Sequence, residues 1–229
     1  MNKQVGVQPG TSATSIKSAE LDNNVKVVSE AIESYLKRTG DDTLIYERGH
    51  SNAGKKATAV ERNRLPELAH LGDTIGAVPD GGMWFVKQSD GSRRLLAAFE
   101  AKYQGKTGNA YERWNKNYMI CEYINPALVY VTFMTGEGAR DGNVLHSFGT
   151  TMSKIKPDTT IFYYAPDGLT QEEIFGYFKR HLGLSINFQD IQPDLTEVVN
   201  RFTKQKNYFN KYKQKKLAQA VTNTNNVLV

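Results

Sequence analysis

Two acidic residues and one lysine lie at the two ends of a predicted β-hairpin. Asp80 stands just before the hairpin, and Glu100 and Lys102 stand at its end. Both arms of the segment 83–101 are rich in apolar and aromatic residues, and the segment 89–92 between them contains Asp-Gly, a strong signal for a tight turn. If the hairpin folds, its second strand brings Glu100 and Lys102 back to Asp80.

These residue types suit the hydrolysis of a phosphodiester with Mg²⁺. Side chains two residues apart in a strand share a face, so Glu100 and Lys102 project together. The carboxylates of Asp80 and Glu100 and the main-chain carbonyl of Ala101 are hard oxygen ligands of the kind that Mg²⁺ prefers. The ion would activate a water, and Lys102 would position that water or take its proton. The alternative is a solvated ion pair, since Glu-x-Lys arises on the order of once in such a chain by chance.

A basic, glycine-rich loop and a helix start follow directly. Asn109, with Glu112 three residues later, is typical of a helix capping box. One interpretation is therefore an ordinary helix start. The other is that the helix N-terminus enters the major groove of DNA, where Asn109 would bond an adenine edge and Arg113 a purine acceptor. The residue types alone leave both open.

Three sequence blocks follow one another in this region: Pro79-Asp80-Gly81-Gly82, Glu100-Ala101-Lys102-Tyr103-Gln104-Gly105-Lys106 and Gly108-Asn109-Ala110-Tyr111-Glu112-Arg113. Together they resemble the EcoRI/MunI group of type II restriction endonucleases, within the PD-(D/E)xK nuclease superfamily. In EcoRI, blocks of the same kind occur in the same order, but a long DNA-embracing insert separates the second from the third. Here only Thr107 lies between them, so we expect a less complete embrace of DNA.

The resemblance implies a function and a set of site residues. The expected enzyme is a homodimer that cleaves both strands of double-stranded DNA with Mg²⁺ at a short palindrome centred on AATT, leaving four-base 5′ overhangs with 5′-phosphates. A cognate DNA methyltransferase is expected to protect host DNA. Asp80, Glu100 and Lys102 would be catalytic, and Asp80, Glu100 and Ala101 would hold the metal. The residues expected to bind DNA are Gln104, Lys106, Gly108, Asn109, Ala110, Glu112 and Arg113.

Two rival functions share part of this pattern. A structure-directed nuclease, such as a junction resolvase or repair enzyme, would use Asp80, Glu100 and Lys102 but would not need Asn109 and Arg113. A sequence-specific DNA-binding protein would not cleave. Two carboxylates against the phosphates argue against a pure binder, because they weaken its hold on the backbone.

Composition agrees with a soluble cytoplasmic protein that meets a polyanion. The 229 residues are 39% hydrophobic and 23% charged, with a net charge of +5 and a pI near 9.1. The single cysteine, Cys121, cannot form an internal disulfide and is expected in the core. The sequence shows no signal peptide and no apolar run of membrane-spanning length, so we expect no membrane association.

The remaining patterns predict an α/β fold with a central mixed β-sheet flanked by helices, as in a restriction-endonuclease-like core. Residues 1–20 are expected to form a flexible arm and residues 21–229 a single endonuclease domain. Beyond the hairpin, strands are expected at 43–47, 128–134 and 159–164. Helices are expected at 22–39, 109–124, 171–182 and 193–218.

Several segments outside the blocks carry secondary hypotheses. Loop 48–64 is either a solvated loop or a phosphate-binding one, and the glycine-rich segment 135–158 is a loop that could contact the outer bases. Pro166-Asp167-Gly168 is expected to be a turn before a helix capped by Thr170. Two acidic residues could add to the metal site: Glu47 and Glu61. The four histidines lack metal-ligand spacing and are expected to be structural or surface residues: His50, His70, His146 and His181.

Overall fold

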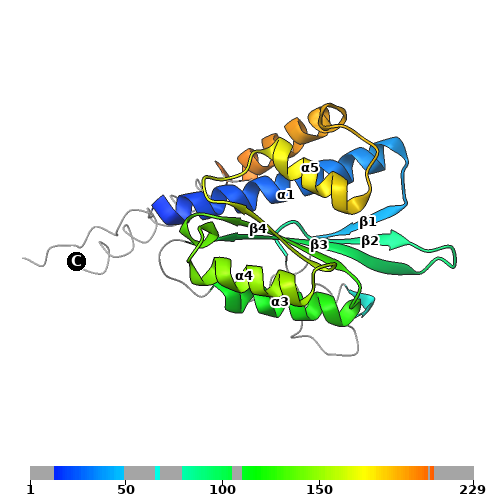
Figure 1. Cartoon of the computed structure of the whole chain (residues 1–229). Helices are drawn as coiled ribbons and strands as arrows, with labels where there is room; N and C mark the ends of the chain where they lie inside the picture. The colour runs from blue at the N-terminus through cyan, green and yellow to red at the C-terminus, as the bar shows by residue number, and fades with distance from the viewer. Residues whose placement is uncertain (1–12, 49–64, 68–78, 105–109, 206, 209–229) are drawn as a thin grey trace, which may run out of the picture.

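A computed structural model describes residues 13–48, 65–67, 79–104, 110–205 and 207–208 (Figure 1). In this part of the chain, five strands form one mixed sheet in the order β1-β2-β3-β4-β5. Neighbours are antiparallel from β1 to β3 and parallel from β3 to β5. The expected α/β fold with a mixed sheet is thereby confirmed. The strands are β1 (Leu44–Glu47), β2 (Met83–Lys87), β3 (Arg93–Tyr103), β4 (Val129–Thr135) and β5 (Thr160–Ala165).

Helices cover both faces of the sheet (Figure 1). One face carries α1 (Ala13–Thr39) and α5 (Gln171–Leu182). The other face carries α3 (Ala110–Ile124) and α4 (Val144–Ile155), which connect the parallel pairs β3/β4 and β4/β5. Short 3-10 helices occur at η2 (Glu137–Ala139) and η3 (Phe188–Ile191), and a further helix follows at 192–205.

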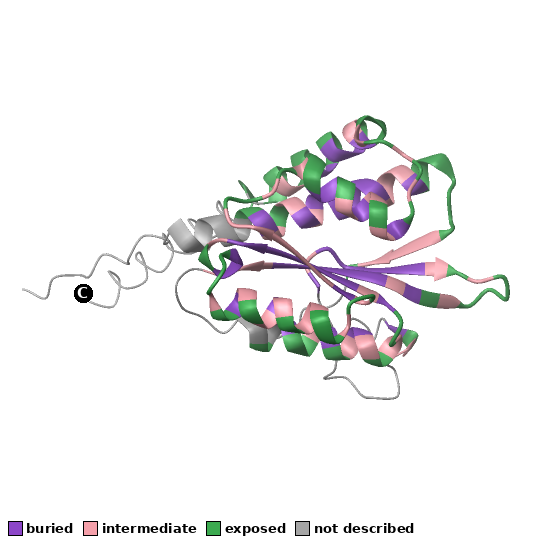
Figure 2. Ribbon diagram, viewed as in Figure 1, coloured by how far each residue is buried: buried purple, intermediate pink, exposed green. Residues whose placement is uncertain are grey.

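A separate hydrophobic core lies on each face, and the strands between them are the most continuously buried part of the molecule (Figure 2). Against α1 and α5, Phe99 stacks on Phe178 with ring centroids 3.8 Å apart. Against α3, Trp114 stacks on Tyr118 at 4.8 Å. Cys121 belongs to this second core, as expected of a small buried residue.

Two boundaries differ from the sequence-based prediction. Helix α1 begins at Ala13 instead of residue 22, so it runs into the predicted flexible arm. The predicted loop 135–158 contains α4, which begins after Asn143, whose side chain accepts a hydrogen bond from the Leu145 N–H. The glycines that suggested a loop occur mainly before this helix, while Gly149 lies inside it, where its bare Cα packs within reach of β5.

Other predictions are confirmed. Strand β4 is buried along almost its whole length, as expected of a central strand covered on both faces. Thr170 forms the predicted capping box with Glu173 at the start of α5, and the segment before it is a turn. Of the last predicted helix, residues 193–205 and 207–208 are described, and the helix begins at residue 192. None of the helices in the described ranges combines the length and apolar character needed to cross a membrane.

Candidate active site

The turn that carries Asp80 is held against β3 by the main chain. The Gly81 N–H donates to the Phe99 carbonyl at 2.8 Å, and the Phe99 N–H donates to the Gly82 carbonyl at 3.1 Å. This pairing extends the β2–β3 hairpin by one step beyond β2. It places the Asp80 carboxylate 3.3 Å from the N–H of Ala101, which donates to Oδ2.

Helix α1 packs on the same turn from the other side. Ser29 Oγ donates to the Gly81 carbonyl at 2.5 Å, and the Trp84 indole N–H reaches the same oxygen at 3.3 Å. A Cβ at Gly81 would lie 2.7 Å from Phe99 Cβ and 2.8 Å from Val25 Cγ1. Only glycine lets the turn lie this close to both β3 and α1, so Gly81 sets the position of its neighbour Asp80.

Glu100 is a buried carboxylate with every oxygen engaged. Its relative exposure is 1%. Oε2 accepts hydrogen bonds from Asn117 Nδ2 at 3.0 Å and from the Tyr130 hydroxyl at 3.2 Å, and Oε1 contacts the Lys102 ammonium. Burial, with smaller contributions from Cys121 and Asp80, raises the pKa of Tyr130 well above its usual value of 10. Tyr130 therefore keeps its proton and remains a donor to Glu100.

The oxygens predicted to hold a metal converge on the Lys102 ammonium. Nζ contacts Glu100 Oε1, lies 3.2 Å from the Ala101 carbonyl oxygen and lies 3.9 Å from Asp80 Oδ2. The structure thus brings the three predicted ligands around one positive charge. Two carboxylates and a carbonyl are the donor set of a hard divalent cation that keeps several waters. Within the described ranges, no three His, Cys, Asp or Glu side chains gather as a metal cluster, so this site would depend on the carbonyl.

A second ammonium faces Asp80 from α1. Lys26 Nζ lies 3.4 Å from Asp80 Oδ1, and its side chain is 32% exposed. Lys26 was not among the residues predicted for the site, because nothing in the pattern of helix 22–39 shows which residue faces the turn. The one feature of the sequence that could have pointed to Lys26 is its place in that helix, between Val25 and Val27, which are both buried.

The predicted DNA-reading segment is described in part. Lys106, Gly108 and Asn109 lie outside the described residues, while Ala110, Glu112 and Arg113 lie in the first turns of α3. Glu112 is exposed. The helix therefore begins where the capping-box pattern predicts, next to the end of β3.

Gln104 has a main-chain role at the end of β3. Its N–H donates to the Thr135 carbonyl at 3.3 Å, and its own carbonyl accepts from the Gly138 N–H at 2.9 Å. These bonds join the end of β3 to the end of β4 and to η2. The predicted contact of Gln104 with DNA stays a prediction.

Two hydrogen bonds fasten α3 to the sheet beneath the candidate site. The Trp114 indole N–H donates to Thr132 Oγ1 at 2.7 Å, and Asn117 binds Glu100 as described above. Thr132 is the β4 partner of Glu100 in the strand register. The helix that begins with the predicted reader therefore contacts the predicted catalytic glutamate about two turns from its start, a link that no sequence spacing revealed.

The secondary candidates that the structure describes do not join this site. Glu47 pairs with Arg93 at 2.7 Å, so the hypothesis that it adds to the metal site is not supported by its position. The Tyr163 hydroxyl and His181 Nε2 are 2.7 Å apart, and His146 lies beside Tyr164, which fits the structural roles expected for both histidines. Glu61, His50, His70 and nearly all of loop 48–64 lie outside the described residues.

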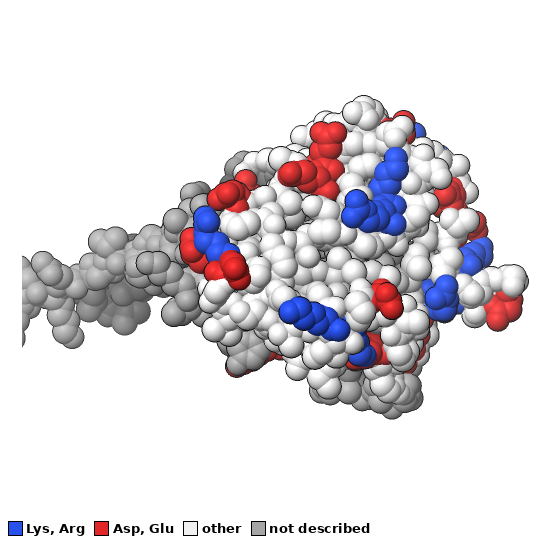
Figure 3. Space-filling model, in the orientation of Figure 1, with Lys and Arg blue, Asp and Glu red and all other residues white. Residues whose placement is uncertain are grey.

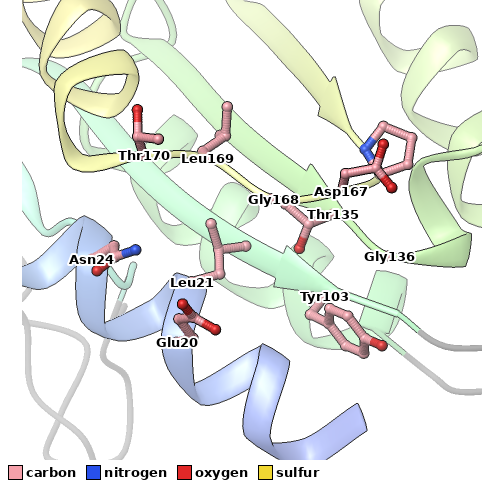
Figure 4. A pocket seen from close by; sticks show the side chains of 11 residues that line it. Glu20, Leu21, Asn24, Tyr103, Thr135, Gly136, Asp167, Gly168, Leu169 and Thr170 are labelled. Atoms are coloured by element: carbon pink, nitrogen blue, oxygen red, sulfur yellow. The ribbon is translucent and has the colours of Figure 1, made fainter. Parts of the chain in front are cut away.

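A cavity of about 290 Å³ lies beside the site, at the carboxyl edge of the parallel strands (Figure 4). Tyr103 and Thr135 line it together with residues of α1 and of the turn after β5. It does not include the candidate catalytic residues, because Lys102 and its neighbour Tyr103 alternate to opposite faces of β3. The cavity therefore lies on the face of β3 opposite to Lys102.

Charge on one face of the molecule is mixed. In the view of Figure 3, basic and acidic side chains lie in small scattered groups, some of which hold both signs, on a mostly uncharged surface. Among its described residues, this face lacks the continuous basic band expected where many phosphates are neutralised.

No known family model and no curated protein matches this chain. The case for its function therefore depends on the site geometry and on the three sequence blocks.

Proposed function

We propose that this protein is a Mg²⁺-dependent type II restriction endonuclease similar to the EcoRI/MunI group. The observation that carries the proposal is the convergence of Asp80, Glu100 and the Ala101 carbonyl on Lys102 at the end of β3. A buried carboxylate, a half-buried one and a lysine seldom share a strand end for stability alone, because burying charge costs free energy. Phosphodiester hydrolysis uses all of them.

Asp80, Glu100 and the Ala101 carbonyl would hold the ion, which when bound supplies Lewis acidity and a water of lowered pKa. Lys102 now contacts the same oxygens. Once those oxygens have another cation, its ammonium is free to orient the attacking water and to neutralise charge on the phosphate.

Asn117 and Tyr130 would act as positioning residues. Both donate to Glu100 Oε2, at 3.0 and 3.2 Å: Asn117 from α3, which covers one face of the sheet, and Tyr130 from β4 within the sheet. With its second oxygen held in this way, Glu100 presents Oε1 toward the scissile phosphate without reorganisation, which is the geometric requirement for a preorganised site.

The specificity follows from the resemblance in the reader segment. We propose that Gly108, Asn109, Ala110, Glu112 and Arg113 read a central AATT in the major groove, with Gln104 and Lys106 as further DNA contacts. A palindromic site has two-fold symmetry, so a homodimer would present one active site to each strand. Its place would be the cytoplasm, where a DNA methyltransferase protects host sites.

The test is digestion of unmethylated phage DNA with Mg²⁺, followed by sequencing of the fragment ends. Discrete fragments with 5′-AATT overhangs support the proposal. Asp80→Asn, Glu100→Gln and Lys102→Met should each abolish cleavage, while the control Glu172→Gln, at an exposed carboxylate of α5, should not. Cleavage confined to branched or damaged DNA contradicts the reader assignment, and intact DNA bound tightly in Mg²⁺ contradicts the nuclease assignment.

A further inference from the structure

Among the described residues of α1, Lys26 places its ammonium beside the Asp80 carboxylate. Lys26 and Lys102 approach different oxygens of that carboxylate. Lys26 Nζ lies 3.4 Å from Oδ1, and Lys102 Nζ lies 3.9 Å from Oδ2. We propose that Lys26 is a fourth charged member of the active site, which binds a phosphate of the cleaved strand when the metal takes its place on Asp80. The inference rests on the proposed nuclease function.

The position of Lys26 is fixed by its neighbours in the helix. Val25 and Val27 are fully buried, and Val25 packs where a Cβ at Gly81 would be. One turn further along, Ser29 donates to the Gly81 carbonyl. The main chain of α1 at Lys26 is therefore held against the turn that carries Asp80, while the side chain, 32% exposed, can turn toward a ligand at the surface.

The charge balance of the site favours an ammonium group at Lys26. Two carboxylates, on Asp80 and Glu100, face two ammonium groups, on Lys26 and Lys102. A bound divalent ion then leaves the site with a double positive charge. Attack on a phosphodiester builds a double negative charge in the transition state, so the site with Lys26 matches the charge that develops. Without Lys26, half of that excess positive charge is lost.

Because Lys26 and the metal both approach Asp80, they compete, and this predicts two effects of opposite sign. Removing the ammonium should strengthen Mg²⁺ binding by about two- to five-fold, the range expected for a partly exposed ion pair. The same change should weaken DNA binding. If one phosphate contact is lost, the slope of log affinity against log salt should become shallower by about 0.9.

The first experiment is calorimetric titration of the full chain with Mg²⁺ in the absence of DNA. Lys26→Met keeps an unbranched apolar stem and removes the charge, and Lys26→Arg restores the charge. Lys37→Met is the matched control, because Lys37 lies on the same helix, is 73% exposed and pairs with Glu33 away from the site. We expect tighter Mg²⁺ binding only in Lys26→Met.

The second experiment measures binding of a duplex with the cleavage site in Ca²⁺, which supports binding without cleavage, over a series of NaCl concentrations. We expect weaker binding and a shallower salt slope for Lys26→Met, rescue by Lys26→Arg and no change in Lys37→Met. Weaker Mg²⁺ binding in Lys26→Met would mean that Lys26 holds Asp80 in place and would overturn the phosphate role. An unchanged salt slope would overturn it as well.

These outcomes are separable from failure of the proposed function. If the wild-type chain neither cuts nor binds duplex DNA, the nuclease proposal fails and the phosphate role of Lys26 fails with it. If the wild type cuts DNA and Lys26→Met matches it in metal affinity and salt slope, the inference about Lys26 fails alone.

Discussion

Replacing Gly81 with alanine tests whether close packing of the turn positions Asp80. The added Cβ would meet Phe99 Cβ at 2.7 Å, Val25 Cγ1 at 2.8 Å and Phe178 Cζ at 3.0 Å. Real Cβ atoms essentially never show contacts under 3.0 Å, and all three neighbouring residues are fully buried, so they have little room to move. The turn must therefore move away from β3 or from α1.

The expected cost follows from the size of the group. One methyl forced into a well-packed core costs about 1–3 kcal/mol of unfolding free energy. For a chain of this length, that lowers Tm by about 2–12 °C at roughly 2–4 °C per kcal/mol. Movement of the turn also stretches the 3.3 Å hydrogen bond from the Ala101 N–H to Asp80. Metal affinity and cleavage should therefore fall by more than the loss of stability explains, because the protein is still folded at 25 °C.

Gly91→Ala is the matched control. Gly91 lies at the tip of the same hairpin with φ +83°, and a Cβ there would meet nothing within 4 Å. Alanine in this left-handed conformation costs about 1 kcal/mol, so stability should fall while Mg²⁺ affinity and cleavage stay at wild-type levels. Thermal unfolding, Mg²⁺ calorimetry and single-turnover cleavage measure the three quantities. Wild-type metal affinity in Gly81→Ala would refute the claim that packing at this glycine places Asp80.

Three further predictions concern groups around the site and in the core. Asn117→Leu removes a charge-assisted hydrogen bond to Glu100, worth about 1.5–3 kcal/mol. Cleavage should therefore slow by about ten-fold or more, while duplex binding in Ca²⁺ is kept. Equal losses in cleavage and binding would contradict a positioning role for Asn117. Burial, and secondarily Arg180, lowers the pKa of His181, so the unfolded chain binds more protons than the folded chain as the pH falls. The contribution of His181 to stability should therefore be full above pH about 6.5 and decline as the pH falls toward the folded pKa. His181→Gln should flatten that decline, as measured by urea unfolding at a series of pH values. Burial raises the pKa of the Cys121 thiol, so DTNB should label it only after unfolding, and rapid labelling of the native protein would show that this part of the core opens.

Local signals in the sequence predicted much of the sheet. The Asp-Gly turn joins β2 to β3 as expected, and the apolar run at 128–134 forms the buried β4. Thr170 caps α5 through the predicted reciprocal bonds with Glu173. Each of these signals depends on residues close together in the chain. Turn and capping preferences of this kind favour the same local structure whatever the tertiary packing around the segment.

Helix α4 shows where local signals mislead. Glycines at 136 and 142 adopt positive φ before the helix and suggested a loop for the whole segment. The helix forms because Asn143 caps it and because Leu145 and its neighbours on that face pack beneath β5. Glycine frequency marks where a chain can turn, but the packing of an amphipathic face decides where a helix forms.

The candidate site shows the same limit for function. Asp80, Glu100 and Lys102 could be named because the hairpin that joins them is encoded locally. Lys26 and Asn117 could not, since Lys26 is 54 residues from Asp80 in numbering and Asn117 reaches Glu100 only after α3 packs on the sheet. Contacts of this kind depend on how helices dock, and no spacing rule encodes docking.

If the proposed reader binds DNA, the way α3 docks would connect that recognition physically to the proposed catalytic glutamate. Because β3 and β4 are parallel, the chain must cross back over one face of the sheet, and α3 makes that crossing directly beneath Glu100. Five residues separate Glu112, in the predicted reader, from Asn117, which is about 7.5 Å along a helix axis. Over so short a distance a helix moves as a rigid body, and Trp114 fixes it to Thr132 within the same span. A misfit between the reader and a wrong base would thus displace Asn117 from Glu100 Oε2 by a similar amount, and a shift of 1 Å or less is enough to break a 3.0 Å hydrogen bond. In such an arrangement, a wrong sequence would slow cleavage more than it weakens binding.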